Sequence, residues 1–420
     1  MSLGLLSLIL LVAAIAIGFF RKINVGLVCL FLAFLLGKAA GIATGEILKG
    51  FNPNLFINLM GITLLFSILN KNGTIELLAK KIVGLAGKNI FLIPIVIFLM
   101  GAFLSGIGPG SIPLLAIMPA IAIPLAKARG YNPLMLAIIG CAGCFGGRIT
   151  PITPEGLLSF DLLRQSGLDT AVIAQPIYLA QCISGFLIAT AAFVYYKGWK
   201  PVPVETTAEE RSASFAPNQW LSLFCLAAMA VMIIGFKQNV GLTGFAISAV
   251  LLMCHAGSEK ESLRAIPWGV LIMVSGVSTL MHLVIKTGGI KMLTAALATL
   301  MNTHTAPAVM ACTAGVMSLF SSGLGVVFPT LIPTVVGLGQ AVGVSPVELA
   351  SMVLIGGTIT GLSPISTTGG LIMATLMAEE SGEAKKGEEM KLFMELVAWA
   401  IGILVVLTLL AGIGVYNIIF

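Results

Sequence analysis

Two short motifs of hydroxyl residues and proline recur in this chain of 420 residues. Thr150-Pro151-Ile152-Thr153 is followed by Gly156, and 213 positions later Ser363-Pro364-Ile365-Ser366 is followed by Gly369. Proline inside an apolar segment interrupts a helix and leaves backbone amides and carbonyls that lipid cannot satisfy. Two such breaks at corresponding places predict a transporter whose substrate and ions bind near the middle of the membrane.

Arg148 lies two residues before the first motif, where a cation without a partner is costly in a membrane. Its guanidinium could bind a substrate carboxylate through two parallel hydrogen bonds. An equally supported alternative is a structural pair with Glu155, about one turn into the restarted helix. Gly361 occupies the matching position in the second half, so we expect an asymmetric anion site with one cation.

Each restarted helix presents unpaired amides and the positive end of its dipole, which favours an anion. The alternative for any single hydroxyl is a hydrogen bond to its own helix backbone, but the repeated spacing favours a functional role. The predicted substrate site comprises Arg148, Thr150, Pro151, Thr153, Ser111, Ser322, Ser363, Pro364, Ser366 and Thr367. The predicted Na+ site uses hydroxyls and freed carbonyls and comprises Gly108, Ser111, Gly147, Thr150, Ser321, Gly325, Thr360 and Ser363.

Composition indicates the broad class, because 58% of residues are hydrophobic, 10% are charged and mean hydropathy is +1.07. These values are typical of an all-α polytopic membrane protein, multi-pass in the inner (plasma) membrane. The net charge of +6 comes from positive residues in short loops and does not indicate nucleic acid. Neither a nucleotide-binding motif nor a catalytic constellation is present in the sequence, so we expect neither an enzyme nor a cofactor.

The spans fall into two halves, 1–197 and 219–420, which are separated by a charged linker over 198–218 that we expect in the cytoplasm. The predicted spans lie near 2–20, 23–43, 53–70, 132–166, 172–197, 219–236, 239–255, 266–286, 346–378 and 391–418. The fourth span of each half is broken, at 148–154 and at 361–367. Between the third and fourth spans we expect an amphipathic arm and then a re-entrant hairpin, near 90–127 and 307–340.

Because a re-entrant hairpin does not cross, each half has five crossings, and an odd number makes the two repeats inverted. Loop charges agree with this topology. The predicted inner loops hold 16 Lys and Arg residues and the outer loops 6, which with Arg148 make up the 23 of the chain. This distribution predicts that both termini lie outside.

The chain resembles the ion transporter superfamily in its order of hairpin, Gly-rich approach and broken helix, repeated once. Within that superfamily it is similar to the MatC-type dicarboxylate (malonate) carriers. The segments that carry this likeness are Ile23-Asn24-Val25-Gly26-Leu27, Asn72-Gly73-Thr74-Ile75 and Ser363-Pro364-Ile365-Ser366. The resemblance implies a fold like that of the divalent anion sodium symporters, which are homodimers that move a transport domain past a scaffold like an elevator.

The Ser-Asn-Thr signature of those symporters is absent here, and Gly110-Ser111 and Ser321-Ser322 stand at the corresponding tips. Our leading hypothesis is a secondary carrier for a small dicarboxylate of the malonate or C4 class, coupled to Na+, with H+ as the alternative ion. Two other functions stay open. They are the membrane subunit of a carrier fed by a soluble binding protein, and a cation/proton antiporter, for which Glu155 is the carboxylate that we place inside the membrane.

Overall fold

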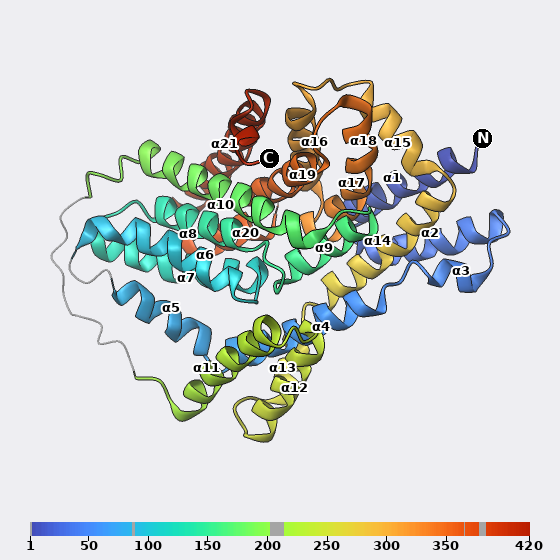
Figure 1. Cartoon of the computed structure of the whole chain (residues 1–420). Coiled ribbons are helices and arrows are strands. Elements are labelled where there is room, and N and C mark those ends of the chain that lie inside the picture. The colour runs from blue at the N-terminus through green and yellow to red at the C-terminus, as the bar shows by residue number, and fades with distance from the viewer. Residues whose placement is uncertain (1, 86–88, 202–213, 365, 378–383) are drawn as a thin grey trace.

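The computed structural model describes residues 2–85, 89–201, 214–364, 366–377 and 384–420, and their regular secondary structure is entirely helical (Figure 1). Most of the predicted linker and Ile365 of the second motif therefore lie outside the described residues. The chain is an all-α polytopic membrane protein.

Most long helices of the first half begin with a side-chain cap or a proline. Asn52 and Asn132 each accept a hydrogen bond at 3.0 Å from a backbone amide three residues later, and a proline follows at the first helical position. The helices are α1 (Leu3–Arg21), α2 (Val25–Ala39), α3 (Thr44–Leu48), α4 (Pro53–Lys71), α5 (Thr74–Gly84), α6 (Ile93–Gly106), α7 (Ser111–Arg129), α8 (Pro133–Gly147), α9 (Pro154–Gln165) and α10 (Thr170–Tyr195).

The second half has a similar order of helices. They are α11 (Pro217–Ala230), α12 (Val240–Met253), α13 (Glu259–Ala265), α14 (Trp268–Lys286), α15 (Gly289–Ala298), α16 (Ala306–Phe320), α17 (Phe328–Leu331), α18 (Val335–Val342), α19 (Pro346–Ile359), α20 (Thr367–Met377) and α21 (Ala384–Gly412). A π-helical turn over Gly323–Val327 joins α16 to α17. The two predicted arms form α5 and α15, and each follows a glycine in the left-handed region, Gly73 at φ 75° and Gly288 at φ 84°.

Seven helical segments of the described chain are long and apolar enough to cross a membrane: 3–21, 53–71, 111–129, 170–195, 268–286, 323–342 and 388–412. Two of them, 111–129 and 323–342, are the second halves of the predicted hairpins. Helices α2 and α8 have 15 residues each and rise about 22 Å, which is less than the roughly 30 Å of the hydrocarbon core. Length alone does not say which helices cross, so the ten spans and the inversion stay predictions.

Glycines bring helices of the two halves into backbone contact. A Cβ added to Gly26 of α2 would collide with the Ile272 carbonyl of α14, and one added to Gly61 of α4 would collide with the Gly241 carbonyl of α12. The second predicted span of each half, α2 or α12, thus packs on the third predicted span of the other half, α14 or α4. Small residues permit such close packing in membrane proteins. In Figure 1, α4 lies beside α11, α12 and α13, apart from the group that contains α6, α7, α8 and α10.

The first helix of each hairpin, α6 or α16, lies against the broken helix of its own half. Gly143 of α8 meets the Phe98 carbonyl of α6, and Gly356 of α19 meets the Ala311 carbonyl of α16, in both cases without room for a Cβ. Any larger residue would separate these helices. This packing places each hairpin tip next to a helix break.

Candidate functional site

The break between α8 and α9 is closed by the last residue of the first motif. The Thr153 hydroxyl accepts from the Gly156 amide at 3.1 Å and donates to the carbonyls of Arg148 and, at 2.9 Å, Thr150. Thr153 therefore caps α9. A Cβ at Gly156 would collide with the Thr150 carbonyl, which explains the glycine that follows the motif.

The second motif has the same local arrangement. The Ser366 hydroxyl accepts from the Gly369 amide at 3.4 Å and donates to the carbonyls of Gly361 and, at 2.6 Å, Ser363. A Cβ at Gly369 would meet the Ser363 carbonyl. The repeated spacing thus reflects a repeated helix cap. In this structure the hydroxyls of Thr153 and Ser366 bond to the backbone of their own helix breaks, as in the alternative to a ligand-binding role. The Thr367 side chain lies outside the described residues.

The tip of the first hairpin holds a buried carboxylate. Gly108 and Gly110 adopt φ values of 145° and 70°, which turn the chain between α6 and α7. At the start of α7 the Ser111 amide and hydroxyl donate to Glu155 Oε1 at 3.0 and 2.6 Å. Glu155 is 1% exposed and approaches Gly110 so closely that a Cβ there would collide with Oε2. The carboxylate therefore occupies the amino end of α7, where the helix dipole favours a negative charge.

Arg148 ends α8 and reaches across the molecule, although only 7% of it is exposed. Its Nη2 donates to Thr358 Oγ1 of α19 at 2.6 Å, and its Nη1 donates to Ser111 Oγ at 3.3 Å. The rings of Phe145 and Phe328 lie 5.9 and 5.6 Å from the guanidinium carbon, within the range of cation–π contacts. The cation is thus held by residues of both halves, and Ser111 links it to the Glu155 carboxylate.

Several buried polar atoms around this cluster have no hydrogen-bond partner among the residues that the structure describes. They include Arg148 Nε, Glu155 Oε2, Ser105 Oγ and Gln181 Oε1. Buried polar groups are normally satisfied, so such atoms indicate a site for a further polar group. A guanidinium carries five N–H donors, of which Nε and the second hydrogens of both Nη atoms are free for an anion.

Two of the carbonyls freed at the end of α8 receive a side-chain hydrogen bond. Gln181 Nε2 donates to the Phe145 carbonyl at 3.0 Å and Cys182 Sγ donates to the Gly146 carbonyl at 3.2 Å, both from α10. The Thr150 hydroxyl donates to the Gly106 carbonyl of the hairpin at 2.8 Å. These bonds fix the break and the hairpin tip as one structure.

The second hairpin tip is closed in a similar way. Ser322 Oγ accepts from the Gly325 amide at 3.1 Å, and Ser321 Oγ donates to the Met317 carbonyl at 2.6 Å. Thr360 Oγ1 donates to the Gly315 carbonyl at 3.1 Å. Gly325 lies against the Met273 side chain of α14. The hydroxyls of this tip therefore serve the local backbone, whereas Ser111 of the first tip contacts Arg148.

Of the predicted site residues, the structure places Arg148 and Ser111 in direct contact and sets Thr150 and Thr153 in the turn that supports them. Sequence reasoning missed Thr358, Phe145, Phe328 and Gln181. Thr358 is the second-half counterpart of Phe145 at the offset of 213. The offset relates these two positions, but only the fold shows that both contact Arg148.

Comparison with known proteins bears on this arrangement of hairpin, break and buried arginine. Residues 1–148 match the family model of the dicarboxylate carrier protein MatC N-terminus, and Arg148 is the last residue matched. Over these residues the chain is similar to the MatC-type dicarboxylate carriers. The resemblance stated from the sequence is confirmed, and the protein is a transporter.

Two further proteins match over most of the chain. An uncharacterized transporter of Haemophilus influenzae is 23% identical over 397 residues, covering 85% of this chain and 81% of the relative. The crystal structure of the Alcanivorax borkumensis YdaH transporter matches with a TM-score of 0.55 at 13% identity, covering 91% of this chain and 88% of that one. The structural likeness shows a shared fold.

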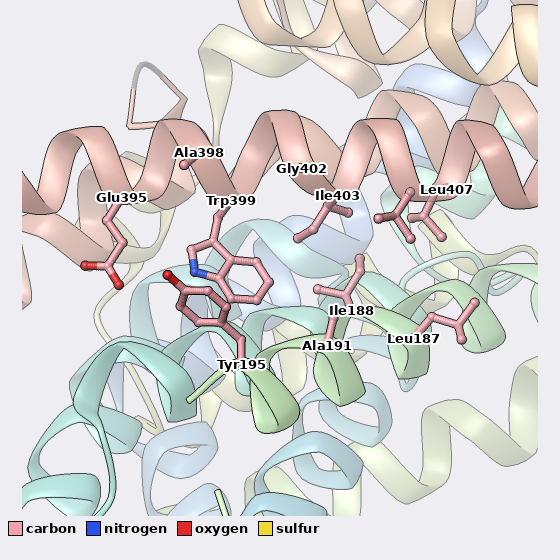
Figure 2. Close-up of a pocket in the computed structure, with 11 residues that line it drawn as sticks. Leu187, Ile188, Ala191, Tyr195, Glu395, Ala398, Trp399, Gly402, Ile403 and Leu407 are labelled. Carbon is pink, nitrogen blue, oxygen red and sulfur yellow. The ribbon is translucent and has the colours of Figure 1, made fainter. Parts of the chain in front are cut away.

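A cavity in the carrier lies away from Arg148. It has a volume of about 260 Å³ and opens between α10 and α21, with Leu187, Trp399 and Leu407 among its lining residues (Figure 2). Because neither Arg148 nor Ser111 lines it, we base the substrate site on the buried polar cluster rather than on this cavity. Among the described residues, no three His, Cys, Asp or Glu side chains are grouped to hold a metal ion.

Proposed function

We propose that the chain is a secondary transporter for small dicarboxylates of the malonate or C4 class, with Arg148 as the main substrate ligand. The observation that carries this proposal is the buried guanidinium, which lies between the two halves and whose Nε has no hydrogen-bond partner in the described part of the chain. A substrate carboxylate would accept from Nε and one Nη, in the bidentate geometry that arginine favours. Hydrogen bonds to a charged group typically contribute about 1.5–3 kcal/mol each, so this pair would dominate binding.

Glu155 has a distinct role in this proposal. In the absence of substrate it partly offsets the charge of Arg148 through the Ser111 hydroxyl. A substrate carboxylate that binds Arg148 would compete for Ser111 and weaken this link. The second carboxylate would face the amino end of α9, whose dipole favours an anion, because Glu155 already occupies the amino end of α7.

Na+ is the proposed coupling ion, because two substrate charges exceed the one cation that Arg148 supplies. The unpartnered Oε2 of Glu155 adds a hard oxygen ligand beside the predicted set, which begins with Gly108, Ser111, Gly147 and Thr150. The proposal includes an elevator movement in a homodimer, in which the hairpins, the broken helices and the spans that follow them, α10 and α21, move past α1–α4 and α11–α14. The membrane is proposed to be the inner (plasma) membrane, with both termini outside.

Proton coupling is the alternative that one observation favours. Besides Glu155, the side chain of Glu348 in the first turn of α19 is buried, at 8% exposed, and a buried carboxylate can exchange a proton during transport. This observation also keeps the cation/proton antiporter open. The binding-protein-dependent carrier would share the same site.

Uptake of labelled malonate and succinate into proteoliposomes tests these proposals. We expect accumulation by the wild type with an inward Na+ gradient, no accumulation by Arg148→Ala, and wild-type uptake by Arg164→Ala, which changes an exposed arginine of α9. Normal uptake by a folded Arg148→Ala variant would show that Arg148 is structural. Equal accumulation with and without the Na+ gradient, together with a response to a pH gradient, would identify H+ and not Na+ as the coupling ion.

A further inference from the structure

The cavity between α10 and α21 is a groove with one polar end. Figure 2 shows Glu395, Trp399 and Tyr195 at one end and Leu187 and Leu407 at the other. The walls between them are aliphatic and include Ile188 and Ile403. The dicarboxylate of the proposed function would find no cation among these lining residues, so the groove suits a different ligand.

The polar end is built by a chain of hydrogen bonds. Trp399 Nε1 donates to Tyr196 OH at 2.9 Å, and Tyr196 OH donates to Glu395 Oε1 at 2.5 Å. The Tyr195 ring meets the Trp399 ring edge to face at 5.4 Å, and the Tyr196 ring stacks on Trp399 at 5.9 Å. These contacts hold a carboxylate beside aromatic rings in a fixed geometry.

The length of the groove matches one leaflet of a bilayer. Glu395 and Leu407 are 12 residues apart on α21, which corresponds to about 18 Å along the helix. The hydrocarbon of one leaflet is about 15 Å thick, half of the roughly 30 Å core. An acyl chain that extends from the membrane surface toward the midplane would therefore fill the aliphatic part.

The charge at the polar end selects the headgroup. The Glu395 carboxylate is held beside aromatic rings, and such a group favours an ammonium through ion pairing, with cation–π contact from the rings in support. We propose that this groove binds a phospholipid with a primary ammonium headgroup, phosphatidylethanolamine, whose ammonium meets Glu395.

Gly402 offers a direct way to fill the groove. It lines the cavity, and a Cβ added there meets no atom within 4 Å, so Gly402→Leu fits the helix backbone and occupies the acyl position. Gly84 of α5 also has no atom within 4 Å of an added Cβ and does not line the groove, so Gly84→Leu is the matched control. Ala398→Leu is a second groove-filling variant if Gly402→Leu lowers Tm.

Native mass spectrometry of the delipidated protein in detergent tests the proposal, with phosphatidylethanolamine and phosphatidylglycerol of identical acyl chains as probes. The wild type and Gly84→Leu should bind one phosphatidylethanolamine at least about tenfold more tightly than phosphatidylglycerol, the change that one strong charge contact produces. Gly402→Leu should lose this binding, and Glu395→Gln should bind both lipids equally. Equal binding of both lipids by the wild type would overturn the proposal. Undiminished binding of phosphatidylethanolamine by Gly402→Leu would also overturn it. The same holds if Gly402→Leu changes the oligomeric mass of the protein without loss of bound lipid.

Discussion

Arg148 at the end of α8 donates a hydrogen bond to Thr358 of α19 at 2.6 Å, so the cation of the first half is anchored in the second half. The same guanidinium contacts Ser111 at the tip of the first hairpin. A ligand that binds Arg148 therefore touches an element that connects the hairpin with both broken helices.

Removal of the Thr358 hydroxyl tests this anchor. We expect Thr358→Val to raise the KM for dicarboxylate uptake by about five- to tenfold, which corresponds to the roughly 1 kcal/mol of one hydrogen bond. Thr358→Ser should restore the wild-type value, since it keeps the hydroxyl. If both variants transport as the wild type does, the hydrogen bond has no part in substrate binding.

Gly110 should tolerate no side chain. Gly110→Ala would adopt an unfavourable φ of 70° and would also press its Cβ against Glu155 Oε2, which should abolish transport. Gly41→Ala is the control, because Gly41 has a similar φ of 65° but no atom within 4 Å of an added Cβ. Comparable uptake by the two variants would mean that the contact between the hairpin tip and Glu155 is dispensable.

The two motif hydroxyls should contribute to stability through helix capping. Thr153→Val removes the cap of α9, and we expect a loss of about 1 kcal/mol in the free energy of unfolding, with Thr153→Ser close to the wild type. The melting temperature in detergent measures this effect. An unchanged melting temperature in Thr153→Val, combined with lost substrate binding, would instead assign this hydroxyl to the substrate.

A cluster of charges at the end of α14 predicts a pH dependence at low pH. Hydrogen bonds from Lys286 at 2.9 Å and Lys49 at 2.8 Å lower the pKa of Glu46 to about 2, and His282 also faces this carboxylate at 3.6 Å. A depressed carboxyl pKa stabilises the folded state above the unfolded value of roughly 4.3, and this contribution is lost as pH falls toward 2. The Tm difference between the wild type and Glu46→Gln should thus be constant from pH 5 to 8 and shrink below pH 4.5, about where the unfolded carboxyl titrates. A constant difference at every pH would contradict this view.

The sequence predicted the positions of the breaks closely, because proline and glycine have strong local effects. The first break was expected at 148–154, and α8 ends at Gly147 while α9 begins at Pro154. The role of Thr153 and Ser366 was harder to predict, because a hydroxyl that caps a helix and one that binds a ligand have the same sequence pattern. Thr358 and Phe328 could not be found from sequence spacing, since only the packing of the second half against α8 brings them to Arg148.

Calorimetric binding of malonate and succinate to the purified protein tests the central claim most directly. The wild type and the control Arg164→Gln should bind a dicarboxylate, and Arg148→Gln should lose at least about a hundredfold in affinity, as expected when a buried bidentate ion pair is broken. Arg148→Lys should recover only part of this loss, since lysine cannot form the bidentate contact. Equal affinity of the wild type and a folded Arg148→Gln variant would contradict the assignment of Arg148 as the substrate ligand.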